Sequence, residues 1–404
     1  MSVFDVRHQP TAQRILQRAL QSARVPHAYV FHGPEGVGRE MLAVRFVKLL
    51  LCDNRRQPTD PPEEYAGLHD QWLDSCGHCK SCMLVDADTH PDCHFIHRRL
   101  AKFHSDSAVR GRKAYELGID VIRQFVIEAA GKKPVLGVAK VFVIRECERL
   151  TLGAQNALLK TLEEPPEGTH LILLTNALGK LLPTTRSRCQ SVSFRPLPPD
   201  FVAETLHALR REVNEEQIHY LANHQPGSLG SAMQLCDYGF YGRNQELVES
   251  IVTLGRTDSL KLARHLETAG KEMSSVIRER SNKAARSENE STAIRKARST
   301  KGAEKDDGEG LSESDAMRQA LRHLLAMMAT FYRDLLRLSC GCRSGICNAA
   351  ALAELEPLAA RLGPEPARQA IRAVAEAESQ LNMNANTRLC LEGLAIRLAR
   401  MQSK

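Results

Sequence analysis

The sequence is poor in aromatic side chains and lacks long apolar runs. Its 404 residues include one Trp, and Phe, Tyr and Trp together make up 5%. No apolar run reaches the roughly 18 residues that a membrane-spanning helix needs. The first residues also contain no basic segment followed by an apolar core, as an export signal would. These absences predict a cytoplasmic protein without membrane contact.

The composition indicates a globular protein of more than one domain. The chain is 43% hydrophobic and 25% charged, which are ordinary values for a folded protein, and it is longer than one typical domain. Its net charge of +7 permits contact with a polyanion but does not identify one. Twelve cysteines without an export signal indicate thiols or metal ligands rather than a disulfide framework.

In the first half of the chain, short apolar segments alternate with amphipathic ones. The predicted strands are 28–31, 93–96, 141–144 and 171–175, and the predicted helices are 11–23, 39–51, 119–130 and 155–162. This alternation predicts an α/β domain with a parallel sheet covered by helices. After Pro196-Leu197-Pro198-Pro199 the pattern is helical only, so this segment is a predicted hinge.

The second half is predicted to be all-helical. Residues 201–235 have the pattern of a small helical domain, and 316–338 and 376–401 that of long helices closing a bundle. Between them, 278–315 is rich in Ser, Lys, Arg, Glu and Gly, and predicts a disordered or loosely helical insertion. The predicted domains are 1–195, 196–238 and 239–404.

A glycine loop follows the first predicted strand. Gly33 and Gly38, with Gly36 between them, fit a phosphate loop, in which a lysine reaches the phosphates and a hydroxyl holds Mg²⁺. Arg39 stands at the lysine position and Glu40 at the hydroxyl position. A carboxylate there repels a triphosphate, and a forked guanidinium does not replace an ammonium group. The sequence therefore predicts a structural loop that does not bind ATP.

The end of the predicted strand 141–144 also departs from the pattern of a working ATPase. An ATPase of this kind has an aspartate there for Mg²⁺, usually followed by a glutamate that activates water. This chain reads Arg145-Glu146-Cys147-Glu148. Arg145 puts a cation at the metal position, and Glu146 replaces only part of the acidic pair. We therefore expect no intrinsic ATPase activity.

A cysteine cluster lies in a module between residues 52 and 93. Cys76, Cys79 and Cys82 have C-x₂-C-x₂-C spacing, and Cys52 is a more distant fourth thiol. Four thiolates suit one tetrahedral Zn²⁺ in a closed structural site. An iron–sulfur cluster uses similar spacing and is the main alternative metal site. Reduced thiols without any metal are the other alternative.

The fourth ligand is left open by the spacing, because the insertion after Cys52 is long. The substitutes for Cys52 are His78, His90 and Cys93. A second cysteine group has no fourth ligand nearby and is interpreted as ordinary thiols; it consists of Cys340, Cys342 and Cys347.

Three further segments carry a family resemblance. They are Val25–Phe31, Asn156–Pro166 and Arg186–Cys189. In this order they resemble the bacterial clamp-loader subunits of the AAA+ family, whose members include gamma/tau and delta-prime types. The resemblance covers about residues 7–100 and 117–235. It implies an AAA+-type α/β domain with a zinc module, a small helical lid and an all-α collar domain.

The resemblance also implies roles for single residues. Arg188 matches the family's arginine finger, which reaches the ATP of a neighbouring subunit in trans. Motor members of the gamma/tau type have a loop lysine, an acidic pair and a sensing arginine on the lid, whereas this chain has Arg39, Arg145 and Gly230 at those places. The three differences favour the non-motor, delta-prime type.

The implied function is that of a clamp-loader stator, a component of the DNA polymerase III holoenzyme. Its implied partners are gamma/tau and delta in a hetero-pentamer, the sliding clamp, and primer-template DNA. Two alternatives remain: an ATP-hydrolysing motor subunit of the same complex, and a zinc-dependent DNA-binding protein outside it. No interleaving of basic and aromatic residues assigns direct DNA contacts.

Overall fold

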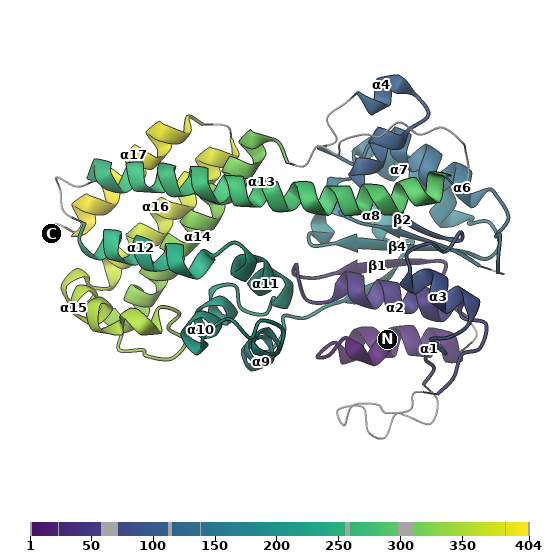
Figure 1. Ribbon diagram of the computed structural model, residues 1–404, viewed down its shortest axis with the longest axis horizontal. Coiled ribbons are helices and arrows are strands. Elements are labelled where there is room, and N and C mark those ends of the chain that lie inside the picture. The colour runs from purple at the N-terminus through teal and green to yellow at the C-terminus, as the bar shows by residue number, and fades with distance from the viewer. Residues whose placement is uncertain are drawn as a thin grey trace. The chain divides into compact units, whose positions relative to one another are not determined.

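The computed structural model describes residues 2–22, 24–57, 72–111, 115–137, 139–254, 259–297, 311–383 and 385–402 (Figure 1). The chain forms two compact units, Met1–Leu197 and Pro198–Lys404. None of the helices in the described ranges has both the length and the apolarity that crossing a bilayer requires. The predicted division into three domains stays a prediction.

The first unit is built on a five-stranded sheet of order β2-β3-β4-β1-β5, in which all neighbouring strands are parallel. The strands are β1 (Ala28–His32), β2 (Cys93–Ile96), β3 (Lys140–Ile144), β4 (Thr169–Thr175) and β5 (Gln190–Ser193). The inner strands β1, β3 and β4 are almost continuously buried, as expected of a parallel sheet with helices on both faces. The predicted parallel α/β sheet is confirmed.

Helices cover both sides of this sheet. Figure 1 shows α1 (Pro10–Gln21) and α2 (Arg39–Leu51) on one side and α7 (Leu152–Glu163) on the other. Leu158 of α7 packs in a buried cluster with Phe142 of β3 and Leu171 of β4. The remaining helices of this unit are α3 (Lys80–Asp86), α4 (Ser107–Arg110), α5 (Ile119–Ile122), α6 (Glu128–Ala130) and α8 (Pro183–Arg186), with the short elements η1 (Val3–Asp5), η4 (Arg98–Phe103), η5 (Arg123–Ile127), η6 (Cys147–Arg149) and η7 (Leu178–Lys180).

Strand β5 has no counterpart among the predicted strands. It pairs with β1 at the edge of the sheet, with Tyr29 opposite Gln190 and His32 opposite Ser193. Within β5 only Val192 is buried. An edge strand with one buried side chain needs no apolar run, so the hydrophobic pattern did not reveal it.

The second unit is helical in every regular element that the structure describes. Its helices are α9 (Pro199–Leu209), α10 (Glu215–His224), α11 (Leu229–Asp237), α12 (Phe240–Val252), α13 (Ser259–Ala297), α14 (Glu313–Ser339), α15 (Leu352–Leu362), α16 (Pro364–Asn382) and α17 (Thr387–Gln402), with the short η9 (Ala349–Ala351). The all-helical second half is thus confirmed. Of the predicted insertion 278–315, residues 278–297 are the end of α13, and 298–310 lie outside the described residues.

One helix prediction in this unit is wrong. Residues 376–401 were expected to form a single helix, but α16 ends at Asn382 and α17 begins at Thr387. Asn386 Oδ1 accepts a hydrogen bond from the Leu389 backbone N–H at 3.2 Å. Asparagine is favoured at the N-cap because its side chain satisfies a free N–H of the first turn. The apolar periodicity continues through this break and therefore concealed it.

Candidate functional site

The glycine loop joins β1 to α2, and its glycines are required by close packing. Gly33 has φ 147°, and a Cβ atom there would lie 2.5 Å from the carbonyl oxygen of Phe194. Gly38 has φ 96°, and a Cβ atom there would lie 2.9 Å from Cγ1 of Val6. Only glycine adopts such backbone angles without strain and leaves this space. Packing and backbone conformation therefore require glycine at both positions, independently of phosphate binding.

The loop is also anchored by the side chain of Gln9. Gln9 is buried, and its Nε2 donates to the backbone oxygens of Val37 (3.3 Å) and Arg195 (2.8 Å). Its Oε1 accepts from the Arg195 backbone N–H at 3.0 Å. One amide side chain thus ties the loop to the segment that follows β5.

The two residues that replace the loop lysine and hydroxyl contact groups of this chain. Burial lowers the pKa of Arg39, although Glu148, Glu35 and Glu40 oppose that shift. The Glu40 carboxylate forms an ion pair with Arg145, which directly follows β3. An ion pair therefore joins the hydroxyl position of the loop to the strand end where an ATPase has its Mg²⁺ aspartate.

The other carboxylates at the end of β3 are engaged as well. Glu146 has φ 52° and pairs with Arg98 at 3.3 Å and with Arg149 at 3.5 Å. Glu148 Oε2 accepts from Thr175 Oγ1 at 3.0 Å and from the Asn176 backbone N–H at 3.3 Å. Mg²⁺ requires well-placed oxygen ligands, and the carboxylates here already have partners within the chain.

Arg188 lies between α8 and β5 and is partly exposed. Its Nε donates to Glu163 Oε1 at 2.7 Å, and its Nη1 donates to the backbone oxygen of Thr184 at 2.8 Å. Glu163 is the last residue of α7. Glu163 lies in the segment Asn156–Pro166, but no sequence pattern indicates that it contacts Arg188. A guanidinium held in this way has a fixed direction, and its role in trans stays a prediction.

The four predicted metal-ligating cysteines come together. The Sγ atoms of Cys52, Cys76, Cys79 and Cys82 all lie within 4.8 Å of one another, and those of Cys76 and Cys82 are 3.9 Å apart. Four sulfurs bound at 2.3 Å around a tetrahedral Zn²⁺ would be about 3.8 Å apart. The thiol set therefore fits a metal ion of this size and geometry.

The backbone around the cluster points N–H groups at the sulfurs. The backbone N–H of Cys76 donates to Cys52 Sγ (3.3 Å), that of Cys79 to Cys76 Sγ (3.3 Å) and that of Cys82 to Cys79 Sγ (3.4 Å). For Cys76, burial opposes ionisation, but hydrogen bonds from the backbone of His78 and Cys79 and from neighbouring thiols lower its pKa to about 6. Such donors stabilise thiolate, which is the form that binds metal.

Contacts with η1 and α1 explain why Cys52 belongs to this set. Cys52 directly follows α2. Where the described chain resumes, Trp72 stacks on Phe4 with ring centroids 5.0 Å apart. The Gln17 side chain forms two hydrogen bonds with the backbone of Leu73: its Nε2 donates to the carbonyl oxygen at 2.8 Å, and its Oε1 accepts from the N–H at 2.9 Å. These contacts bring the chain back beside the end of α2, so that Cys76 reaches Cys52.

Helix α3 is fixed to α2 by a buried cation. Lys48 of α2 is almost fully buried, and its Nζ lies 2.5 Å from Asp86 Oδ2 at the end of α3.

Among the described residues, the possible substitutes for Cys52 are not in the cluster, and neither is the second cysteine group. These residues are His78, His90, Cys93, Cys340, Cys342 and Cys347.

Comparisons with known proteins find similarity to subunits of DNA polymerase III. A family model described as "DNA polymerase III, delta subunit" matches residues 8–198, and one described as "DNA polymerase III, delta subunit, C terminal" matches 311–400. The DNA polymerase III subunit delta-prime of Escherichia coli is 35% identical over 58% of this chain and 61% of its own length. The aligned part thus spans about three fifths of that relative.

Two further matches are more distant. The DNA polymerase III subunit tau of Bacillus subtilis is 29% identical over 65% of this chain and 43% of its own length. A crystal structure of a gamma subunit-related protein from Thermotoga maritima has a TM-score of 0.43 and 16% identity, and the match covers 97% of this chain and 99% of that one.

Proposed function

The chain belongs to the DNA polymerase III delta-prime family, and from this we propose that it is a non-motor subunit of a clamp loader. In this proposal it assembles with gamma/tau and delta subunits in a hetero-pentamer and helps to place the sliding clamp on primer-template DNA. The proposal includes a cytoplasmic location.

The Glu40–Arg145 ion pair is the observation that carries the non-motor part of the proposal. In a working site the same two positions hold a hydroxyl and a carboxylate, both on Mg²⁺. Here one is an anion and the other a cation, and they neutralise each other without metal. With Arg39 at the lysine position as well, ATP binding by this chain is not expected.

The catalytic part of the proposal belongs to Arg188. Phosphoryl transfer develops negative charge on the transferring oxygens, and a positioned guanidinium stabilises that charge. Glu163 and the Thr184 carbonyl oxygen fix the side chain while leaving it partly exposed. In the assembly, Arg188 would reach the ATP of a neighbouring motor subunit and complete that site.

We also propose that the four-cysteine cluster holds Zn²⁺. When bound, the ion would supply a closed structural crosslink between four thiolates, without a position for substrate. The chain's own contribution is to align the sulfurs through backbone N–H groups and through the Lys48–Asp86 pair between α2 and α3.

The proposal is tested by reconstitution with motor and delta subunits. Native mass should show a pentamer that contains this chain. We expect Arg188→Ala to assemble normally and to slow hydrolysis at the site it completes by on the order of a thousandfold. The other sites retain their finger, so the ATPase of the whole assembly falls less. Arg211→Ala, at another exposed arginine, is the control. Unchanged clamp-stimulated ATPase in the Arg188 variant would remove the finger assignment.

A binding measurement on the isolated chain distinguishes the motor-subunit alternative from the non-motor proposal. Titration with ATP and Mg²⁺ at micromolar concentrations should give no heat and no change in melting temperature. Saturable binding in that range would favour the motor alternative. Failure to assemble with the other subunits would favour the DNA-binding alternative instead.

A further inference from the structure

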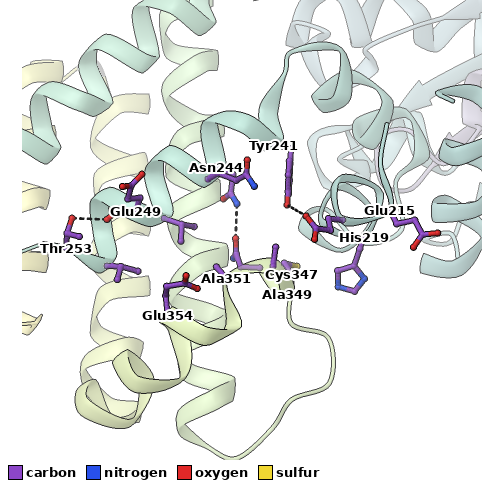
Figure 2. A pocket seen from close by; sticks show the side chains of 16 residues that line it. Glu215, His219, Tyr241, Asn244, Glu249, Thr253, Cys347, Ala349, Ala351 and Glu354 are labelled. Atoms are coloured by element: carbon purple, nitrogen blue, oxygen red, sulfur yellow. Dashed lines mark hydrogen bonds between the residues drawn. The ribbon is translucent and has the colours of Figure 1, made fainter. Parts of the chain in front are cut away.

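The second unit contains a cavity of about 700 Å³. It is lined by residues of α10, of α12 and of the segment from Cys347 to Glu354. Figure 2 shows Asn244 and Tyr241 on one side of it and Ala349, Ala351 and Glu354 on the other. Its volume is in the range of sites that hold ligands or anchoring side chains. No residue of the predicted finger, loop or cysteine cluster lines it.

The floor of this cavity is held in place by a buried polar network. Asn244 donates from Nδ2 to Asn348 Oδ1 at 2.8 Å and accepts from the Tyr220 hydroxyl at 2.8 Å. Asp334 is fully buried and accepts from the backbone N–H groups of Cys347 (3.0 Å) and Asn348 (2.8 Å). Because these hydrogen bonds join α10, α12, α14 and the segment that contains Asn348, the floor keeps its shape without a ligand.

One wall of the cavity is apolar. Val248 and Val252 of α12 line the cavity, as do Ala349–Ala351. Tyr241 adds an aromatic ring, and its hydroxyl donates to Glu216 Oε2 at 3.4 Å. This wall suits a hydrocarbon stem rather than a fully polar ligand.

The rim has charge of one sign. It carries the carboxylates of Glu215, Glu216, Glu249 and Glu354, all of them exposed. Among the described residues that line the cavity, none is Lys or Arg. Four carboxylates at the rim attract a cation and disfavour an anion such as DNA or a nucleotide.

We propose that this cavity is the docking site for an arginine-bearing segment of a neighbouring protein subunit. An arginine stem would lie along Val248 and Val252, and its guanidinium would reach the carboxylates at the rim. A neutral core inside a charged rim is the usual anatomy of a protein interface, where arginine is enriched. The inference rests on the proposed function for the identity of the partner, which is a clamp-loader subunit.

The test uses the full chain in the reconstituted assembly. Glu249→Arg/Glu354→Arg reverses two rim charges, and Glu246→Arg, an exposed position of α12 outside the cavity, is the matched control. Affinity for the motor and delta subunits is measured at two salt concentrations. We expect the double reversal to weaken assembly by about tenfold or more and to reduce its salt dependence, whereas the control leaves both unchanged. Melting temperature and circular dichroism verify that each variant folds.

A crosslink identifies the occupant directly. Benzoylphenylalanine at Ala350 should trap a subunit segment that contains arginine, and the same group at exposed Leu209 should not trap it. Equal affinity of both variants together with no crosslink from position 350 overturns the inference while the assembly stands. Binding of spermidine that depends on Glu249 and Glu354, without any subunit crosslink, overturns it in favour of a small polyamine. If the wild-type chain does not assemble at all, the proposed function fails first, and the docking site fails with it.

Discussion

The two compact units differ in how their chemically notable residues are arranged along the chain. In the first unit, the glycine loop, the C-x₂-C-x₂-C run and the Arg188 motif are each a few consecutive residues. In the second unit, the polar network and the cavity combine residues from α10, α12, α14 and the segment after it. Sites of the first kind are visible as short motifs in the sequence, whereas the second kind exists only after helices distant in sequence have packed.

This difference predicts how each unit responds to a mutation or to a change in charge. In the first unit, one local crosslink or ion pair can be removed and its effect confined to its own segment. In the second, buried polar groups depend on one another, so a change in the charge of one affects the whole network. Changes made in one unit at a time can therefore test this contrast.

Loss of metal should have the largest effect, confined to the first unit. Purified chain should contain about one zinc, and structural zinc contributes on the order of 10 kcal/mol of binding free energy in small modules. We expect Cys82→Ser, or a strong chelator, to remove the metal and to speed hydrogen exchange in α3 and around Cys76. The sheet and the second unit should keep their protection. Cys340→Ser, at an exposed thiol, is the control. Retention of one zinc by the Cys82 variant would contradict the assignment.

Acid should destabilise the second unit through buried histidines. Burial, with Arg322 nearby, lowers the pKa of His323 to about 4, and burial, with His323 and Arg333, lowers that of His224 to about 3. Between pH about 6.5 and 4 the unfolded chain binds protons that the folded chain excludes. The unfolding free energy therefore falls as pH falls, by up to about 1.4 kcal/mol per pH unit for each histidine.

Replacement of one histidine isolates this contribution. The ring of His323 packs edge-on near those of Tyr238 and Phe240, with centroids 6.0 and 5.9 Å away, so His323→Phe keeps an aromatic ring there. Denaturant unfolding should show a shallower loss of stability from pH 6.5 to 4 than in wild type. His207→Gln, at an exposed histidine, should leave the slope unchanged. A slope equal to wild type in the Phe variant would show that folding does not lower the pKa of His323.

The same contrast explains how much could be predicted from sequence. The parallel sheet, the loop and three of the four cysteines follow from apolar runs and spacings of a few residues, whereas the spacing left the place of Cys52 open. Strand β5 did not, because only Val192 of it is buried. The break between α16 and α17 was concealed by continuous apolar periodicity. The cavity in the second unit had no sequence signal at all, since Tyr241 and Ala349 are brought together only by tertiary packing.

A smaller effect is expected at Glu163, which positions Arg188. Glu163→Gln removes the charge that holds the guanidinium but keeps the length of the side chain. We expect assembly to be unchanged and turnover at the neighbouring ATP site to fall about threefold to tenfold, without a change in KM for ATP, because a mobile arginine stabilises the transition state less. Glu163→Asp should recover part of the rate. Glu164→Gln, at the adjacent exposed glutamate, should match wild type. An equal loss in both Gln variants would assign the effect to the turn rather than to Arg188.

The smallest effect is expected at the Glu40–Arg145 pair. The Glu40 side chain is 51% exposed and that of Arg145 is 26% exposed, and ion pairs this accessible to water contribute about 0 to 1 kcal/mol. Glu40→Gln should therefore lower the unfolding free energy by less than about 1 kcal/mol, and Glu35→Gln, elsewhere in the loop, should serve as the control.

The Glu40 variant should also fail to bind ATP and Mg²⁺ at micromolar concentrations. Arg39 still occupies the lysine position, and Arg145, which also lies over the ring of Phe95, still places a cation where the metal would lie. Measurable binding after this single change would mean that the pair alone closes the site. No binding, together with near-normal stability, would mean that the loop is kept by its packing against Phe194, Val6 and Gln9. The ion pair would then be a consequence of the missing metal chemistry and not the feature that holds the fold.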